Sequence, residues 1–149
     1  MKVLIDSNVL VAALLESHEH HSFSRELLER AFRCEYEPSI SNHGLAETYS
    51  QLTAHPRQRI SPQTAITTMT YATDQMTVIE LQTANYKEAL GRADRLNVTG
   101  GGVYDLLHVE AASKAGADLI ATWNVNHFKR LCANESFEPL TPEEILGRR

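Results

Sequence analysis

Three acidic side chains in this sequence lie in separate predicted elements. Asp6 directly follows the apolar run 3–5, whereas Glu47 and Asp105 lie in two predicted helices. Carboxylates supplied by separate elements are the ligands that hard divalent cations such as Mg²⁺ take in proteins. Two such cations, about 3.5–4 Å apart, can activate a water molecule and stabilise the leaving oxygen of a phosphodiester. These residue types therefore predict metal-dependent phosphodiester chemistry.

Asp105 is the most informative of the three because its predicted helix is apolar nearly all round. On a helical wheel it shares a face with His108, Val109 and Ala112. A carboxylate buried in such a helix costs several kcal/mol unless a cation or a metal partners it. In the alternative interpretation, Asp105 lies in the first turn, where the amino-terminal helix dipole stabilises it.

Asp6 and Glu47 each have an ordinary structural alternative. Aspartate is favoured as the N-cap of a helix, and Asp6 precedes the segment 9–15, which is predicted to be helical. Glu47 lies about opposite the stripe that contains Leu45 and Leu52. That face borders a cleft in one interpretation and faces solvent in the other.

The segment after the fourth predicted strand adds polar and aromatic candidates. Asn124 offers a carbonyl oxygen to a hard cation or to its bound water, or it is simply a turn residue. Trp123 is a candidate to stack on a base, with packing beneath the loop as the alternative. Lys129 and Arg130 are candidates to attract phosphates, although most such side chains are only solvated.

These residues are positioned by an alternation of predicted strands and helices. Strands are predicted over residues 3–5, 34–40, 78–81, 118–122 and 137–140. Helices are predicted over about 9–15, 23–32, 41–56, 61–74, 83–96 and 103–115, with a last helical turn from 141. Such an alternation indicates an α/β fold with a parallel sheet covered on both faces. Ligands of such sheets bind beyond the carboxyl ends of the strands, where Asp6 lies.

Length and charge restrict the class of protein. The 149 residues fit one domain, which we expect to span 1–149. Lysine and arginine number 14 against 19 for aspartate and glutamate, so the formal net charge is −5. A general nucleic-acid coat protein would be basic, and this chain is not. A nuclease remains compatible, because metal ions reverse the local charge of clustered carboxylates.

The cysteines and the apolar runs indicate a cytoplasmic protein without a membrane partner. Cys34 and Cys132 form no C-x-x-C pair, and we expect both to be inert thiols, with Cys34 buried at the start of the strand 34–40. The longest apolar runs, such as 9–15, are too short to cross a bilayer. Residues 1–6 are typical of a first core strand rather than of a signal peptide.

Four motifs together resemble a known family. They are K-V-L-I-D-S-N-V-L, N-H-G-L-A-E-T-Y, Y-D-L-L-H-V-E-A-A and A-D-L-I-A-T-W-N-V-N-H-F. In this order they resemble the PIN domain, and more narrowly the VapC-type toxins of bacterial toxin–antitoxin pairs. The resemblance extends over essentially the whole chain.

This resemblance implies a Mg²⁺- or Mn²⁺-dependent endoribonuclease that uses one or two ions. The implied fold is a three-layer α/β/α sandwich around a central, mostly parallel sheet of four to five strands. The resemblance assigns Asp6, Glu47 and Asp105 as catalytic residues and metal ligands. It also implies RNA as the substrate, a homodimer, and a cognate antitoxin that lays a peptide across the cleft.

The sequence departs from the resembled pattern at its fourth acidic position. Related chains often carry aspartate there, and this chain has Asn124, Asn126 and His127 in that segment, with His127 just before Phe128. We expect Asn124 to be the fourth catalytic contact, with Thr122 as its neighbour.

Two other functions remain open from the sequence. The missing fourth acidic residue favours a catalytically degenerate module, which would bind RNA or a partner protein without cleavage. A phosphoryl-transfer enzyme would use Asp6 as its nucleophile, but no second aspartate follows at Asp-x-Asp spacing. Metal-dependent RNA cleavage is therefore the leading expectation.

Overall fold

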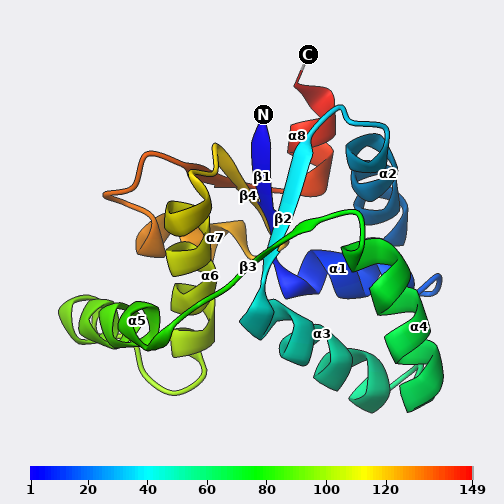
Figure 1. Cartoon of the computed structure of the whole chain (residues 1–149), viewed down its shortest axis with the longest axis horizontal. Coiled ribbons are helices and arrows are strands. Elements are labelled where there is room, and N and C mark those ends of the chain that lie inside the picture. Colours follow the sequence, from blue (N-terminus) through cyan, green and yellow to red (C-terminus); the bar gives the residue numbers. More distant parts are fainter. Residues whose placement is uncertain (149) are drawn as a thin grey trace.

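Five parallel strands form one sheet in the order β3-β2-β1-β4-β5 (Figure 1). The computed structural model describes residues 1–148. The strands are β1 (Lys2–Ile5), β2 (Glu37–Ser41), β3 (Thr77–Ile79), β4 (Leu119–Ala121) and β5 (Glu138–Leu140). The helices are α1 (Ser7–Leu14), α2 (His21–Phe32), α3 (Asn42–Ala54), α4 (Pro62–Thr73), α5 (Thr83–Leu96), α6 (Gly102–Ala115), α7 (Val125–Leu131) and α8 (Pro142–Gly147). The expected α/β fold with a parallel sheet is confirmed.

Helices cover both faces of the sheet and complete the three layers of the sandwich. In Figure 1, α5, α6 and α7 lie to the left of the sheet, and α1, α2, α4 and α8 lie to the right. Leu4 of β1 belongs to one buried cluster with Leu106 of α6, whereas Val3 and Ile5 belong to another with Leu27 of α2. Successive strand residues point to opposite faces, so a strand buried on both faces is apolar throughout.

The carboxyl ends of three neighbouring strands meet where α1 and α3 begin. β1 pairs with β2 on one side and with β4 on the other, and the amide of Asp6 still donates to the carbonyl oxygen of Ala121 at 3.0 Å. At the start of α3, the side chain of Ser41 accepts a hydrogen bond from the amide of Gly44 at 2.9 Å. This is the edge of a parallel sheet at which ligands bind.

The first turn of α3 lies close to the end of β2. A Cβ atom added at Gly44 would lie 2.9 Å from Cγ1 of Ile40, which is nearer than real side chains approach. Glycine therefore allows α3 to begin this close to Ile40. The direction in which α3 leaves the sheet determines where Glu47 lies one turn later.

The predicted apolar helix around Asp105 is confirmed as α6. Its residues from Leu106 to Ala112 are all buried, and it ends at Gly116, which has the left-handed φ of 61° that glycine adopts without strain. Asp105 lies in the first turn of this helix, so its backbone position is held by a buried element.

The expected strand 34–40 is corrected at its start, because β2 begins at Glu37. Cys34 is exposed in the turn after α2, with φ at 63°, and its amide donates to the carbonyl oxygen of Ala31 at 2.8 Å. The prediction that Cys34 is buried is therefore wrong. Cys132 is buried, and burial raises the pKa of its thiol to about 12, which keeps the thiol unreactive.

The segment after β4 is more ordered than a polar loop. It forms the helix α7, in which Phe128 and Leu131 are buried against the α6 side of the sheet. Apolar residues three apart share one face of a helix, and this short pattern was outweighed in the sequence by the surrounding asparagines. Within residues 1–148, no helix is long and apolar enough to span a membrane.

Candidate active site

Two carboxylates and one imidazole converge beyond the ends of the strands. Ligand atoms of Asp6, Glu47 and His108 all lie within 4.8 Å of one another. Asp6 follows β1, Glu47 lies in the second turn of α3, and His108 lies one turn after Asp105 in α6. Three elements that are distant in the sequence thus bring titratable groups to one place.

Asp6 is buried, with 3% of its surface exposed. Its Oδ2 accepts a hydrogen bond from the hydroxyl of Thr122 at 2.7 Å, and its Oδ1 lies 3.5 Å from Nε2 of His108. Burial raises the pKa of this carboxyl, while His108 and the Thr122 hydrogen bond act in the opposite direction. Asp6 is the N-cap residue of α1, but its side chain makes no capping hydrogen bond and belongs to the cluster instead.

Glu47 is held from three sides. The hydroxyl of Ser7 donates to its Oε1, Nε2 of His108 lies 3.0 Å from the same oxygen, and Nε2 of His43 lies 3.5 Å from Oε2. Burial acts to raise the pKa of Glu47, but the hydrogen bonds from His108 and Ser7 outweigh it and lower that pKa to about 2. Glu47 is thus an ionised carboxylate in a fixed orientation.

His108 is fully buried between the two carboxylates. Burial acts to lower the pKa of its imidazole, but Glu47 and Asp6 outweigh burial and raise it. Its other nitrogen, Nδ1, has no hydrogen-bond partner among the described residues. Nε2 is therefore the ring nitrogen that faces the two carboxylates.

Asp105 lies next to this group and pairs with a different imidazole. Its Oδ2 is 3.1 Å from Nε2 of His127, which lies in the first half of α7. Burial raises the pKa of Asp105 to about 6, with a further contribution from the charge of Asp6. The site thus has two adjoining parts, one around Asp6, Glu47 and His108 and one around Asp105 and His127.

The donor set fits a divalent cation. Among residues 1–148, the ion pairs of the three carboxylates are formed with histidines, and no lysine or arginine pairs with Asp6, Glu47 or Asp105. Charges removed from water need a partner of opposite sign. Carboxylate oxygens are the ligands that hard divalent cations take in proteins.

The remaining predicted contacts lie at the rim of the site or away from it. Asn124 is exposed at the start of α7, and its amide donates to Thr122 Oγ1 at 3.0 Å. Lys129 is exposed in the last turn of α7. Arg130, in the same turn, donates a hydrogen bond from its guanidinium to the backbone carbonyl oxygen of Leu96.

Trp123 is packed rather than open. Its indole NH donates to the hydroxyl of Ser24 at 2.9 Å, and the ring of His20 stacks on it at 3.9 Å between centroids. This is the packing alternative that the sequence left open. Stacking of a base on Trp123 would require His20 to move.

Sequence reasoning missed several side chains that complete the site. Ser7 and His43 orient Glu47, and Tyr104, which is 49% exposed, stacks on His43 beside Asp105. His108 had a detectable signal, since it shares the helical face of Asp105. The other contacts join residues far apart in the chain and leave no local pattern.

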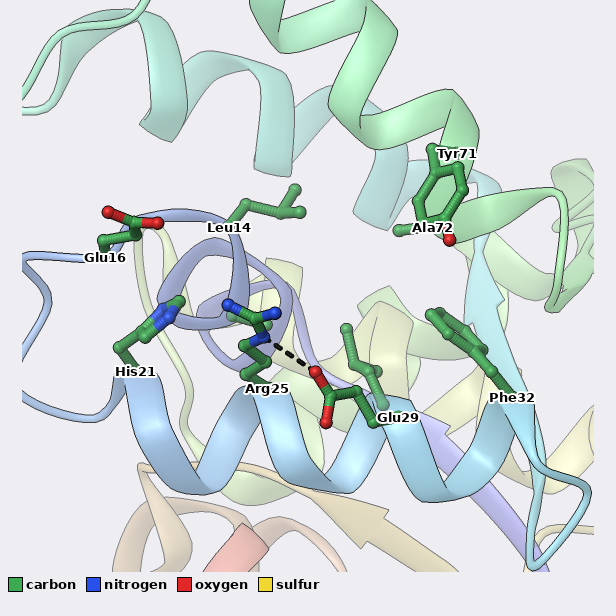
Figure 2. Close-up of a pocket in the computed structure, with 10 residues that line it drawn as sticks. Leu14, Glu16, His21, Arg25, Glu29, Phe32, Tyr71 and Ala72 are labelled. Carbon is green, nitrogen blue, oxygen red and sulfur yellow. Dashed lines mark hydrogen bonds and ion pairs between the residues drawn. The ribbon is translucent and has the colours of Figure 1, made fainter.

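An apolar groove between α1, α2 and α4 is a different feature of the surface (Figure 2). It has a volume of about 330 Å³ and includes Leu14, Phe32 and Tyr71 in its lining. Arg25 and Glu29 form an ion pair of 2.8 Å within it. None of the clustered carboxylates lines this groove, so it is separate from the candidate active site.

Comparisons with known proteins agree with this arrangement. Residues 3–134 match the PIN domain family. The chain is 32% identical over 117 residues to Ribonuclease VapC27 of Mycobacterium tuberculosis, which covers 77% of this chain and 80% of that protein. It is 31% identical over 144 residues to Ribonuclease VapC40 of the same species, which covers 95% of this chain and 96% of that protein.

Solved structures share the fold at low sequence identity. The crystal structure of VapC20 from Mycobacterium tuberculosis, described as a toxin that cleaves the sarcin-ricin loop, aligns with a TM-score of 0.69 at 14% identity over 92% of this chain and 99% of that one. VapBC2 from Rickettsia felis, bound to a DNA fragment from its promoter, aligns with a TM-score of 0.68 at 18% identity over 95% and 98% of the two chains. The match over residues 3–134 and the two relatives above 30% identity show that the chain belongs to the PIN-domain family and, within it, to the VapC group.

Proposed function

We propose that this protein is a metal-dependent endoribonuclease and the toxin of a toxin–antitoxin pair. The observation that carries the proposal is the convergence of Asp6 and Glu47, with Asp105 beside them, in a site without a lysine or arginine partner. The relatives named as VapC ribonucleases support RNA as the substrate.

Asp6, Glu47 and Asp105 would hold one or two divalent cations, Mg²⁺ or Mn²⁺. When bound, such a cation lowers the pKa of a water molecule and stabilises negative charge on the phosphate. The chain's own residues orient its ligands: Thr122 holds Asp6, and Ser7 with His108 holds Glu47. Hydrogen bonds of this kind to ligating carboxylates raise metal affinity, typically by about 10–100-fold.

RNA would approach over the rim of the site. Lys129 and Arg130 are proposed to attract its phosphates, and Asn124 to contact the phosphate or a bound water molecule. Tyr104 is a better candidate than Trp123 to stack on a base, because Tyr104 is half exposed whereas His20 covers the indole.

The antitoxin, the homodimer and the cytoplasmic location belong to the same proposal. The antitoxin is supported by structural neighbours such as VapBC2, a toxin–antitoxin complex from Rickettsia felis. We also propose that residues 1–149 act as one domain, since β5 and α8 pack on the same sheet as the rest of the chain.

Cleavage of RNA by the purified full chain tests this function. With Mn²⁺ or Mg²⁺ present, we expect the protein to cut RNA, and EDTA to stop it. Asp6→Asn should lower the rate at least about a hundredfold, because loss of a ligand removes several kcal/mol of charge stabilisation.

Asp94→Asn is the matched control, since Asp94 is exposed on α5 and is not part of the site. It should cleave at the rate of the unmodified protein. If EDTA left cleavage intact, or if Asp6→Asn were as active as Asp94→Asn, the mechanism would be wrong. Binding of RNA without any cleavage would favour the degenerate binding module instead.

A further inference from the structure

We propose that Asp105 and His127 form a mixed oxygen and nitrogen position that takes a divalent transition-metal cation in preference to Mg²⁺. This inference rests on the proposed nuclease function and specifies the class of cation at that site. It makes His127 a metal ligand, whereas His108 remains a hydrogen-bond donor that positions Glu47.

The spacing of the two atoms matches that of neighbouring ligands on one cation. Oδ2 of Asp105 and Nε2 of His127 are 3.1 Å apart. Two ligands at about 2.1 Å from a metal and at right angles to each other are separated by about 3.0 Å. A cation could therefore bind between these atoms without a large movement of either side chain.

Both side chains lie on helices that buried residues anchor to the rest of the fold. Asp105 lies directly before the buried run of α6, and His127 lies directly before Phe128, which is 0% exposed. The two side chains themselves are 29% exposed for His127 and 27% for Asp105. The position is therefore rigid in its backbone and open to a cation from solvent.

The surroundings of the two imidazoles decide which of them ligates. If Nε2 of His108 bound a metal, the ring would carry its proton on Nδ1, which is buried and has no hydrogen-bond partner among residues 1–148. An unsatisfied buried donor costs about 1–3 kcal/mol. His127 does not have this problem, because its partly exposed ring lets water accept the proton at Nδ1.

The donor types determine the preferred cation. Mg²⁺ binds almost entirely through oxygen and keeps several of its waters. Imidazole nitrogen favours transition metals, and affinity generally rises from Mn²⁺ through Co²⁺ towards Zn²⁺. The Asp105 and His127 position should therefore bind Mn²⁺ and Co²⁺ more tightly than Mg²⁺, even without RNA.

The test compares the full chain with two variants at position 127. His127→Asp replaces the nitrogen donor by oxygen, and His127→Asn keeps a neutral hydrogen-bonding group without an imidazole. His55→Asp is the control, because His55 lies in the connection between α3 and α4 and takes no part in the site. Circular dichroism and thermal melting establish that each variant is folded.

Pulsed electron paramagnetic resonance with Mn²⁺ alone reports the ligand directly. The full chain and His55→Asp should show electron spin echo modulation from a directly bound nitrogen, and both variants at position 127 should lose it. Calorimetry should show that the ratio of Mn²⁺ to Mg²⁺ affinity falls about tenfold or more in His127→Asp.

Two results would overturn the inference. Absence of nitrogen modulation in the full chain would exclude an imidazole ligand, and its persistence in His127→Asn would assign the nitrogen to another histidine. Either result together with metal-dependent RNA cleavage would leave the proposed function standing. Nitrogen modulation without any cleavage would instead support the metal position and reject the nuclease.

Discussion

At the scale of the residue, acidic side chains were easier to find in the sequence than the histidines that accompany them. Asp105 stood out because a charge in an apolar helix needs a partner, and the structure gives it His127. His108 lies on the same helical face, but a histidine in an apolar helix is usually part of the core. Its contact with Glu47 spans 61 positions, so no local pattern could reveal it.

The raised pKa of Asp105 predicts a gain in stability when its charge is removed. Its carboxyl has a pKa of about 6 in the fold, against an ordinary value of 3.8. The unfolded chain therefore ionises first as pH rises from about 4 to 6, and the fold loses about 2–3 kcal/mol over that range. Well below the ordinary pKa of 3.8 the group is protonated in both states and does not change the free energy of unfolding.

Asp105→Asn should accordingly raise the free energy of unfolding in EDTA by about 1–3 kcal/mol at pH 8, and by almost nothing at pH 4. The same variant should lose cleavage, because it removes a proposed ligand. Urea unfolding at the two pH values measures the effect, with Asp94→Asn unchanged at both. Equal stability of Asp105→Asn and the unmodified protein at pH 8 would show that the charge carries no such penalty.

At the scale of the element, most helices and strands follow from periodicity and caps, and the exceptions have physical causes. The helix predicted over 61–74 is α4, which Ser61 caps and Pro62 begins, and the apolar runs form the central strands. The strand expected from Cys34 starts later because the chain first turns through a left-handed residue. Helix α7 was not predicted, because it is stabilised by the packing of Phe128 and Leu131 against the core. Such tertiary packing cannot be recognised in so short a segment of sequence.

The close contact between α3 and β2 predicts a different effect of alanine at two helical glycines. Gly44→Ala should lower the free energy of unfolding by about 1–3 kcal/mol, because the added Cβ would meet Ile40 at 2.9 Å. Since α3 carries Glu47, cleavage should fall as well. Urea unfolding and RNA cleavage measure the two effects.

Gly91→Ala is the matched substitution in α5, where the added Cβ would meet only the flexible end of Arg95 at 3.4 Å. It should stabilise the protein by up to about 1 kcal/mol, since alanine loses less conformational entropy than glycine in a helix. The interpretation of α3 fails if Gly44→Ala behaves like Gly91→Ala.

At the scale of the whole molecule, the alternation of elements was enough to predict the sandwich and the edge at which ligands bind. The order of the strands in the sheet could not be predicted from the sequence, because it depends on which helices cover which face. That order puts β1 between β2 and β4, and it thereby joins Asp6, Glu47 and Thr122. The convergence of the site is thus a property of the topology and not of any one motif.

Because like charges are gathered in one place, a bound cation should stabilise the entire fold. At a Mn²⁺ concentration of about 100 times the dissociation constant, the gain is about 2.7 kcal/mol, which corresponds to roughly 5–10 °C in melting temperature for a chain of this size. Differential scanning calorimetry before and after EDTA measures it. The melting temperature of Asp6→Asn should rise clearly less on addition of Mn²⁺. If Mn²⁺ did not change the melting temperature of the unmodified protein, that result would argue against a cation site.

The packed indole of Trp123 has a practical consequence. It is the single tryptophan of the chain, it follows Thr122, which holds Asp6, and it is covered by His20. Its fluorescence therefore comes from one known place at the border of the site. A change in emission on addition of metal ions or RNA would follow events at that border in solution, without any attached dye.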